Sequence, residues 1–228
     1  MSPSPPVADQ TALALVQDPG PVVLTGPSFE NFRDLIKMLR DEYDAADAIT
    51  QKSQRFFAMA GIPAINELRY AGHHLLIGIS PRIGAEDSTL ELRRAINHCK
   101  RASYDASEAA ILFAFDKIET FKNDFKDVVI SDVLSDWSSI RARCNEVRDA
   151  LTVARAKGED RFQDHAQTGL MFDELVSVCR RLDGARDDLN TKLAYTITEA
   201  RRFTWNMAFA MVGVVLAVAA IVVTLLVA

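Results

Sequence analysis

Cysteine, proline and glycine are scarce in this sequence, and their positions limit the fold. The three cysteines among 228 residues, Cys99, Cys144 and Cys179, have no C-x-x-C spacing, which argues against a disulfide framework or a thiolate metal site. Six of the eight prolines lie in residues 1–27, and none follows Pro81. Because the rest of the chain has few breaks and no strand-like run, the sequence predicts an all-α protein with long helices.

The common sequence signatures of enzymes are also missing. There is no G-x-x-x-x-G-K-[ST] loop, no G-x-G-x-x-G turn and no G-x-S-x-G nucleophile motif. The net charge is −5, so no global basic field points to nucleic acid. No cofactor is expected from these patterns.

Breaks in the apolar periodicity divide the N-terminal part of the chain. Residues 1–27 are predicted to be a disordered proline-rich arm, and residues 28–128 a helical bundle. The bundle's predicted helices run over 28–57, 63–79 and 88–126, separated by turns near Pro63 and Pro81. Ser88-Thr89-Leu90-Glu91 matches a capping box at the start of the third helix.

Residues 129–202 carry apolar positions at alternating spacings of three and four, which is typical of a coiled-coil seam. We expect a long antiparallel coiled-coil hairpin that forms a stalk, or a last helix that pairs with copies of itself. A protein partner bound through this stalk is a further option. The two seams comprise Trp137, Ile140, Cys144, Val147, Leu151 and Ala154, then Leu175, Val178, Leu182, Ala185 and Leu189.

Charge is absent from the last 26 residues, Phe203 to Ala228. As a helix this segment is about 39 Å long, enough for a hydrocarbon core of about 30 Å. It is therefore predicted to be a transmembrane helix and tail anchor in the lipid bilayer. Arg201 and Arg202 precede it and Trp205 lies near its start, as expected at a membrane interface, so the N-terminal domain is predicted to be cytoplasmic in a single-pass membrane protein.

Together these features favour a membrane-anchored, self-associating helical scaffold or effector that forms a homo-oligomer. The apolar segment contributes a face of small residues that lets backbones approach closely. The predicted oligomerisation residues are Ala210, Gly213, Ala217, Ala220 and Thr224 on that face, with Leu175, Val178, Leu182 and Leu189 from the second seam.

Two arginines are each followed, five positions later, by a histidine: Arg69 with His74, and Arg93 with His98. An R-x4-H element on an all-helical bundle resembles the HEPN families, whose dimers place two such motifs together. The resemblance implies metal-independent RNA cleavage, in which the histidine handles the 2′-hydroxyl proton and the arginine the phosphate. Carried over, Arg69 and His74 are the candidate catalytic residues of a tethered ribonuclease, with Glu67 as a candidate orienting group.

The same histidines also have a structural interpretation. His73 and His74 flank an apolar stripe through Leu75, where a histidine is often packed and hydrogen-bonded. His73, His74 and His98 lie close to Cys99 if the two helices pair, but adjacent helical residues diverge by about 100°. Since tetrahedral zinc needs ligands on one face, no metal site is expected.

Overall fold

The computed structural model describes residues 27–57, 61–80 and 83–227, except for the side chains at 27–29, 219, 222 and 224–227. Apart from Pro27, the predicted N-terminal arm lies outside these residues. Every regular element within the described ranges is helical. The helices are α1 (Pro27–Phe57), α2 (Ile62–Gly78), α3 (Ala85–Asp124), α4 (Trp137–Ala156) and α5 (His165–Val227), with the 3-10 turns η1 (Ile130–Asp132) and η2 (Gly158–Asp164).

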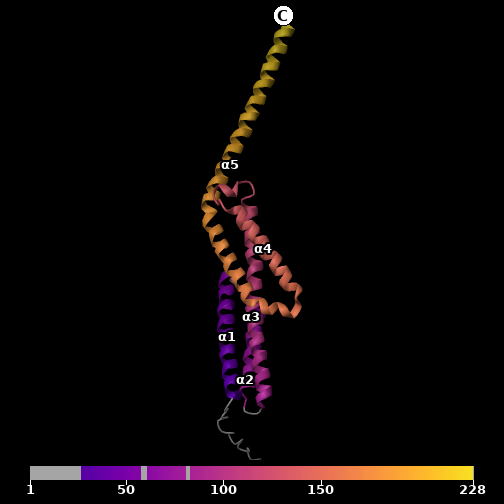
Figure 1. The fold of residues 1–228 in the computed structure, drawn as a ribbon. Coiled ribbons are helices and arrows are strands. Elements are labelled where there is room, and N and C mark those ends of the chain that lie inside the picture. Colours follow the sequence, from indigo (N-terminus) through magenta and orange to yellow (C-terminus); the bar gives the residue numbers. More distant parts are fainter. Residues whose placement is uncertain (1–26, 58–60, 81–82, 228) are drawn as a thin grey trace, which may run out of the picture.

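The long helix α3 is the axis of an elongated bundle (Figure 1). Successive helices alternate in direction (Figure 1). Helices α1 and α2 lie along the first part of α3, the first part of α5 lies along its second part, and α4 joins them there through a shared buried core. The molecule therefore consists of two groups of three helices that follow each other along α3, which belongs to both. We call these groups the first layer (α1, α2 and α3) and the second layer (α3, α4 and α5).

The first layer packs α1 and α2 closely onto α3 through small residues. Ala46, Ala64 and Ala71 meet Ala95 and Ala102, and all are almost fully buried. Alanine adds little bulk, so the helix backbones can approach closely. At the end of α2 the approach to α3 is close, because a Cβ at Gly78 would lie 3.2 Å from the Leu92 side chain.

The second layer is built from larger side chains. Phe121 of α3 and Phe125, which directly follows that helix, pack on each other at 5.0 Å, and Trp137 of α4 contacts Phe121 at 5.9 Å. The α4 seam and the α5 seam face this cluster and are buried in one core with it. The helices predicted as a stalk are thus an antiparallel pair packed against α3. Two ion pairs connect α5 to α4 and to the residue before it, Arg143 with Glu174 and Arg181 with Asp136.

Sequence breakers account for the connections between helices. Pro63 lies in the first turn of α2, where its missing N–H costs nothing. Gly158 has φ of +60°, a left-handed conformation that suits glycine, and it is the first residue of η2, just after the end of α4. The predicted capping box is wrong: α3 starts earlier, at Ala85, and the Ser88 hydroxyl donates to the carbonyl of Gly78.

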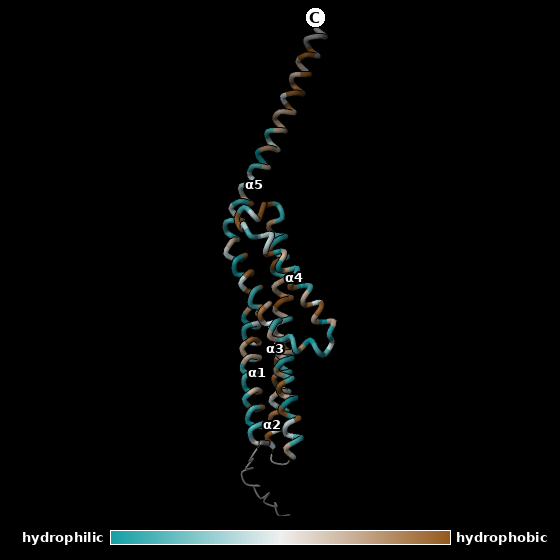
Figure 2. Tube along the Cα trace, viewed as in Figure 1, coloured by the Kyte–Doolittle hydropathy of each residue, from teal (hydrophilic) through white to brown (hydrophobic). Residues whose placement is uncertain are grey.

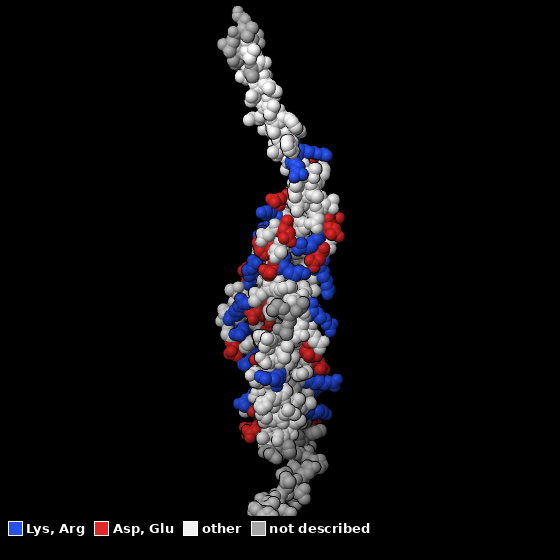
Figure 3. Space-filling view, turned by 180° about the vertical axis from the view of Figure 1, so that it is seen from behind, with Lys and Arg blue, Asp and Glu red and all other residues white. Residues whose placement is uncertain are grey.

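The last part of α5 projects beyond the bundle without a break (Figure 1). Hydrophobic residues recur along the projection (Figure 2), and the space-filling view shows it uncharged above a mixed-charge body (Figure 3). All side chains from Ala194 to Val218 are exposed. We call residues 203–218 the projecting end.

The prediction of a transmembrane helix over 203–228 is corrected. Among the residues that the structure describes, no helix is both long enough and apolar enough to cross a membrane. The predictions of a tail anchor and of a single-pass membrane protein with a cytoplasmic N-terminal domain depend on this helix, so they are wrong as well.

Candidate functional site

Four polar side chains meet between α2 and α3 and form the candidate site. Both helices carry the same pattern, Glu-Leu-Arg-x-Ala-x-x-His, at 67–74 and at 91–98. The helices are antiparallel, so the glutamate of each motif lies opposite the histidine of the other. We call Glu67, His74, Glu91 and His98 the histidine cluster.

Each histidine of the cluster is held by the opposite helix. His74 Nδ1 lies 2.5 Å from Glu91 Oε2, and His98 Nδ1 lies 2.6 Å from Glu67 Oε2. The four side chains are only 12–21% exposed. A carboxylate beside Nδ1 favours the tautomer that carries the proton there, which leaves Nε2 with its lone pair.

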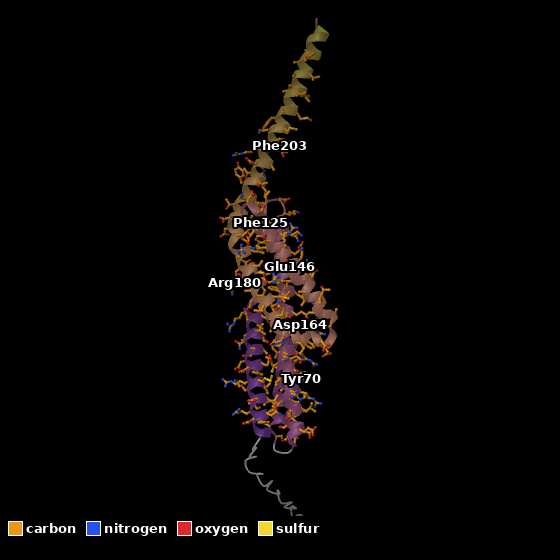
Figure 4. All side chains as sticks on the ribbon, in the orientation of Figure 1. Tyr70, Phe125, Glu146, Asp164, Arg180 and Phe203 are labelled. Atoms are coloured by element: carbon orange, nitrogen blue, oxygen red, sulfur yellow. The ribbon has the colours of Figure 1, made fainter. Side chains whose placement is uncertain are left out.

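The two imidazole rings stack on each other. Their centroids are 5.0 Å apart and their planes differ by 12°. Tyr70 packs on the ring of His98 at 5.6 Å and marks this region of the bundle in Figure 4. The cluster is thus a rigid pair of imidazoles whose Nδ1 atoms are already engaged.

An open cavity of about 240 Å³ adjoins the cluster. It is lined by His74, His98 and Asn97 together with two arginines, Arg94 and Arg101. Arg94 Nη1 donates to Glu91 Oε1 at 2.5 Å, and Arg101 Nη2 donates to Glu159 Oε2 at 2.7 Å. The hydrogen bond with His74, reinforced by Arg94, lowers the pKa of Glu91, so this carboxylate stays charged.

The arginines of the predicted catalytic motifs lie elsewhere. Arg69 is exposed and its guanidinium lies over the ring of Tyr70, 5.1 Å from the centroid. Arg93 is also exposed, and neither residue lines the cavity beside His74. A helix turns about 100° per residue, so positions five apart diverge by about 140°. The structure therefore brings His74 together with Arg94 and Arg101 instead of Arg69.

A second acidic group lies close to the cluster. Asp105, on α3, is largely buried near Glu67 and Glu108, and burial followed by these two negative charges raises its pKa to about 6. Arg161 and Arg101 partly oppose the shift. The region thus holds several carboxylates and cations whose charges nearly balance. Across the described residues, no group of three or more His, Cys, Asp or Glu side chains is arranged to hold a metal ion.

This arrangement presents two imidazoles whose Nδ1 atoms are engaged by carboxylates, so that Nε2 is the ring nitrogen left for chemistry. An Nε2 with a lone pair is a general-base type of group, and it is a general-acid type of group only when it carries a proton. Sequence reasoning missed the pairing because it followed the arginine-to-histidine spacing. The signal that could have found it is the repeated Glu-Leu-Arg-x-Ala-x-x-His pattern, since a repeat across an antiparallel hairpin brings unlike ends together.

The predicted oligomerisation residues fall into two groups. Those of the α5 seam are buried in this chain's own core, so that face is already occupied: Leu175, Val178, Leu182 and Leu189 are at most 8% exposed. Ala210, Gly213, Ala217 and Ala220 are exposed, and a Cβ at Gly213 would meet nothing within 4 Å. The Thr224 side chain lies outside the described residues. The predicted membrane-interface role of Arg201, Arg202 and Trp205, all exposed, is overturned with the transmembrane helix.

The comparisons with known proteins find no relative of this chain. No family model matches the chain. Searches of curated proteins and of solved structures also find no match.

Proposed function

We propose that this chain is a self-associating helical scaffold, in which the projecting end of α5 joins copies of the chain. The observation that carries the proposal is the exposure of a helix that is apolar on all sides. Phe203, Phe209 and Leu216 are 65–68% exposed, and the surface around them has no charge. A helix that is hydrophobic all round is normally covered, and exposed apolar patches of this kind mark interaction sites.

A second copy of the chain fits this surface. Two identical uncharged helices can lie side by side with no like charges in contact along the projecting end. Ala210, Gly213 and Ala217 share one face at spacings of three and four, and this face allows the closest approach of backbones. The N-terminal half of α5 is packed on α3 and α4. The surface of α5 that can contact a second copy is therefore the projecting end.

The test is the mass of the full chain by light scattering in a mild detergent, which limits non-specific aggregation. One copy has a mass of 25.2 kDa, and we expect a multiple of it. Substituting both Gly213→Leu and Ala217→Leu separates the backbones and should return the mass to one copy. The matched control substitutes Val214→Leu and Val218→Leu on a different face and should keep the assembly. A single-copy mass for the unaltered chain contradicts the proposal.

A second candidate function is metal-independent cleavage of RNA at the histidine cluster. The observation that favours it is the stacked pair His74 and His98, each fixed by a carboxylate, beside a cavity lined by Arg94 and Arg101. One imidazole would take the proton of a 2′-hydroxyl, whose oxygen then bonds to phosphorus. The other would protonate the departing 5′-oxygen, and the arginines would hold the phosphate, leaving a 2′,3′-cyclic phosphate.

The assay is cleavage of a single-stranded RNA oligonucleotide in the presence of a chelator. His74→Ala and His98→Ala should each reduce the rate at least about 100-fold, as expected for loss of a general acid or base. His73→Ala is the matched control, because His73 directly precedes His74 in the sequence and its side chain is exposed. The ribonuclease hypothesis fails if the unaltered chain does not cleave RNA or if His73→Ala is equally inactive.

A further inference from the structure

A larger cavity lies where the two three-helix layers meet. It has a volume of about 510 Å³ and is lined by the last turns of α1, by Lys117 of α3 and by α5 from Val176 to Asp183. Pockets for small organic ligands commonly enclose about 300–1,000 Å³. We call this cavity the junction pocket; Arg180, one of its residues, is marked in Figure 4.

The inner wall of the junction pocket is apolar and rigid. Val176 and Cys179 are almost fully buried. The ring of Phe56 packs edge-on against Phe113 at 5.5 Å and against Phe172 at 5.7 Å. These contacts hold Phe56 in place, so the pocket offers a preformed apolar surface to the body of a ligand.

The rim of the junction pocket is strongly cationic. Lys52, Arg55, Lys117 and Arg180 line it, and Asp183 is the one acidic residue among the lining residues. Asp183 accepts from Lys117 at 3.1 Å, while Lys52 is paired with Asp173 just outside the lining.

Two guanidinium groups remain without a carboxylate partner at this rim. Arg55 donates to the neutral amide oxygen of Gln51 at 3.2 Å, and no ion pair with Arg180 occurs within the described residues. Four cations and two carboxylates leave an excess of about two positive charges, in a chain whose net charge is −5. A local field opposite in sign to the whole chain indicates an anionic ligand.

We propose that the junction pocket binds a phosphate monoester carried on an aromatic body, of which a nucleoside monophosphate is an example. A phosphate monoester carries close to two negative charges at neutral pH, which matches the excess at the rim. Guanidinium groups bind phosphate through paired N–H donors, as Arg55 and Arg180 can. The aromatic body would lie against Phe56, whose ring also has Lys117 Nζ 5.7 Å from its centroid.

Binding at this place would also couple the two layers. Arg55 and Phe56 belong to α1 of the first layer, whereas Val176 and Arg180 belong to α5 of the second. A ligand that contacts both sides stabilises the folded chain, and this stabilisation grows with the logarithm of its free concentration once that exceeds the Kd. The junction pocket and the projecting end share no residues, so different variants test ligand binding and self-association.

The test is isothermal titration of the full chain with adenosine monophosphate, inorganic phosphate and adenosine in low-salt buffer. We expect adenosine monophosphate to bind with a Kd in the micromolar range, inorganic phosphate at least about tenfold more weakly, and adenosine not measurably. This order follows because the first probe has both the charge and the aromatic body. Equal affinity for phosphate and the monophosphate, or no heat from the monophosphate up to millimolar concentration, overturns the proposal.

Variants locate the binding. Arg180→Gln and Arg55→Gln should each weaken adenosine monophosphate binding about tenfold or more, which corresponds to one lost charge-assisted contact. Arg141→Gln removes one charge from the exposed surface of α4 and should leave the Kd within about twofold. If Arg141→Gln weakens binding as much as the pocket variants do, the ligand is attracted by positive charge anywhere on the surface, and the pocket proposal is wrong. Thermal denaturation of each variant without ligand verifies that it is folded.

Discussion

The imidazole rings of His74 and His98 stack 5.0 Å apart, although they come from different helices. Each is tied through Nδ1 to a glutamate on the opposite helix, so two reciprocal contacts join α2 to α3. This arrangement fixes the register of the two helices as well as the positions of the rings. The histidine cluster is therefore expected to contribute to stability whether or not it has a catalytic role.

The contribution of Glu91 to the free energy of unfolding can be measured, because this contribution depends on pH. Glu91→Gln should reduce the free energy of unfolding at pH 7 by about 1–2 kcal/mol, because His74 and Arg94 lose a charged acceptor. The pKa of Glu91 is lowered from 4.5 in the folded chain, so its contribution is present above that value and is lost as the pH falls through the folded pKa. Urea unfolding at pH 7 and at pH 3–4 should show the difference between variant and unaltered chain shrinking in acid.

The control for Glu91 is Glu86→Gln, in the exposed first turn of the same helix. It should change the free energy of unfolding by less than about 0.5 kcal/mol at either pH. A Glu91→Gln variant that behaves like this control would show that the contact with His74 adds nothing to stability.

Two glycines of α2 provide a matched pair of substitutions to alanine. Gly78→Ala should destabilise the chain by about 1–2 kcal/mol, because its Cβ would lie 3.2 Å from Cγ and Cδ2 of Leu92 in a packed interface. Gly72→Ala should stabilise it by about 0.5–1 kcal/mol, since a Cβ there meets nothing within 4 Å and alanine favours the helix. Thermal unfolding of both variants measures the two effects, and effects of the same sign would contradict the close approach of α2 to α3.

The existence of the helices could be predicted from the sequence because apolar periodicity and chain breakers act locally. Pro63 and Gly158 mark connections that the structure confirms. The seams also predicted which residues are buried, since Val147 and Leu175 are both in the core. A local pattern does not identify which helix packs against a buried face, however. The spacing of the seams could not show that α3 packs against both of them.

The polar contacts of the candidate site were less predictable. Glu91 matched a capping box by spacing, but α3 starts one turn earlier, and its side chain reaches His74 instead. The arginine-to-histidine spacing selected Arg69, whereas Arg94 and Arg101 line the cavity. A side chain's partner on another helix depends on how the helices pair, and only the repeated Glu-Leu-Arg motif carried information about that pairing.

The thiols are predicted to be unreactive in the folded chain. Burial raises the pKa of Cys99 to about 12 and that of Cys179 to about 11, and it also raises the pKa of Cys144. At pH 8 the thiolate of Cys179 is then about 100-fold rarer than in the unfolded chain, and access is blocked as well. Alkylation followed by mass spectrometry should show slow labelling of all three, with rates that rise with urea as the chain unfolds. Rapid labelling of any one without urea would contradict its burial.

Asp105 is expected to destabilise the folded chain at neutral pH. Burial and the neighbouring charges of Glu67 and Glu108 raise its pKa from 3.8 to about 6, so the folded state binds the proton more tightly than the unfolded state. The carboxyl group therefore costs stability as the pH rises from about 4 to 6, and the full cost is present above that range. Asp105→Asn removes this charge and should raise the free energy of unfolding at pH 7 by about 1–2 kcal/mol.

The pH dependence distinguishes this effect of Asp105 from a general benefit of removing charge. At pH 4 the carboxyl group is protonated in the folded chain, so the advantage of the asparagine variant should nearly disappear. Asp116→Asn, at an exposed position of the same helix, should show neither the gain at pH 7 nor the change with pH. If Asp105→Asn lowers stability at pH 7, the carboxylate gains more from Arg101 and Arg161 than burial and its acidic neighbours cost, and the sign of the pKa shift is wrong.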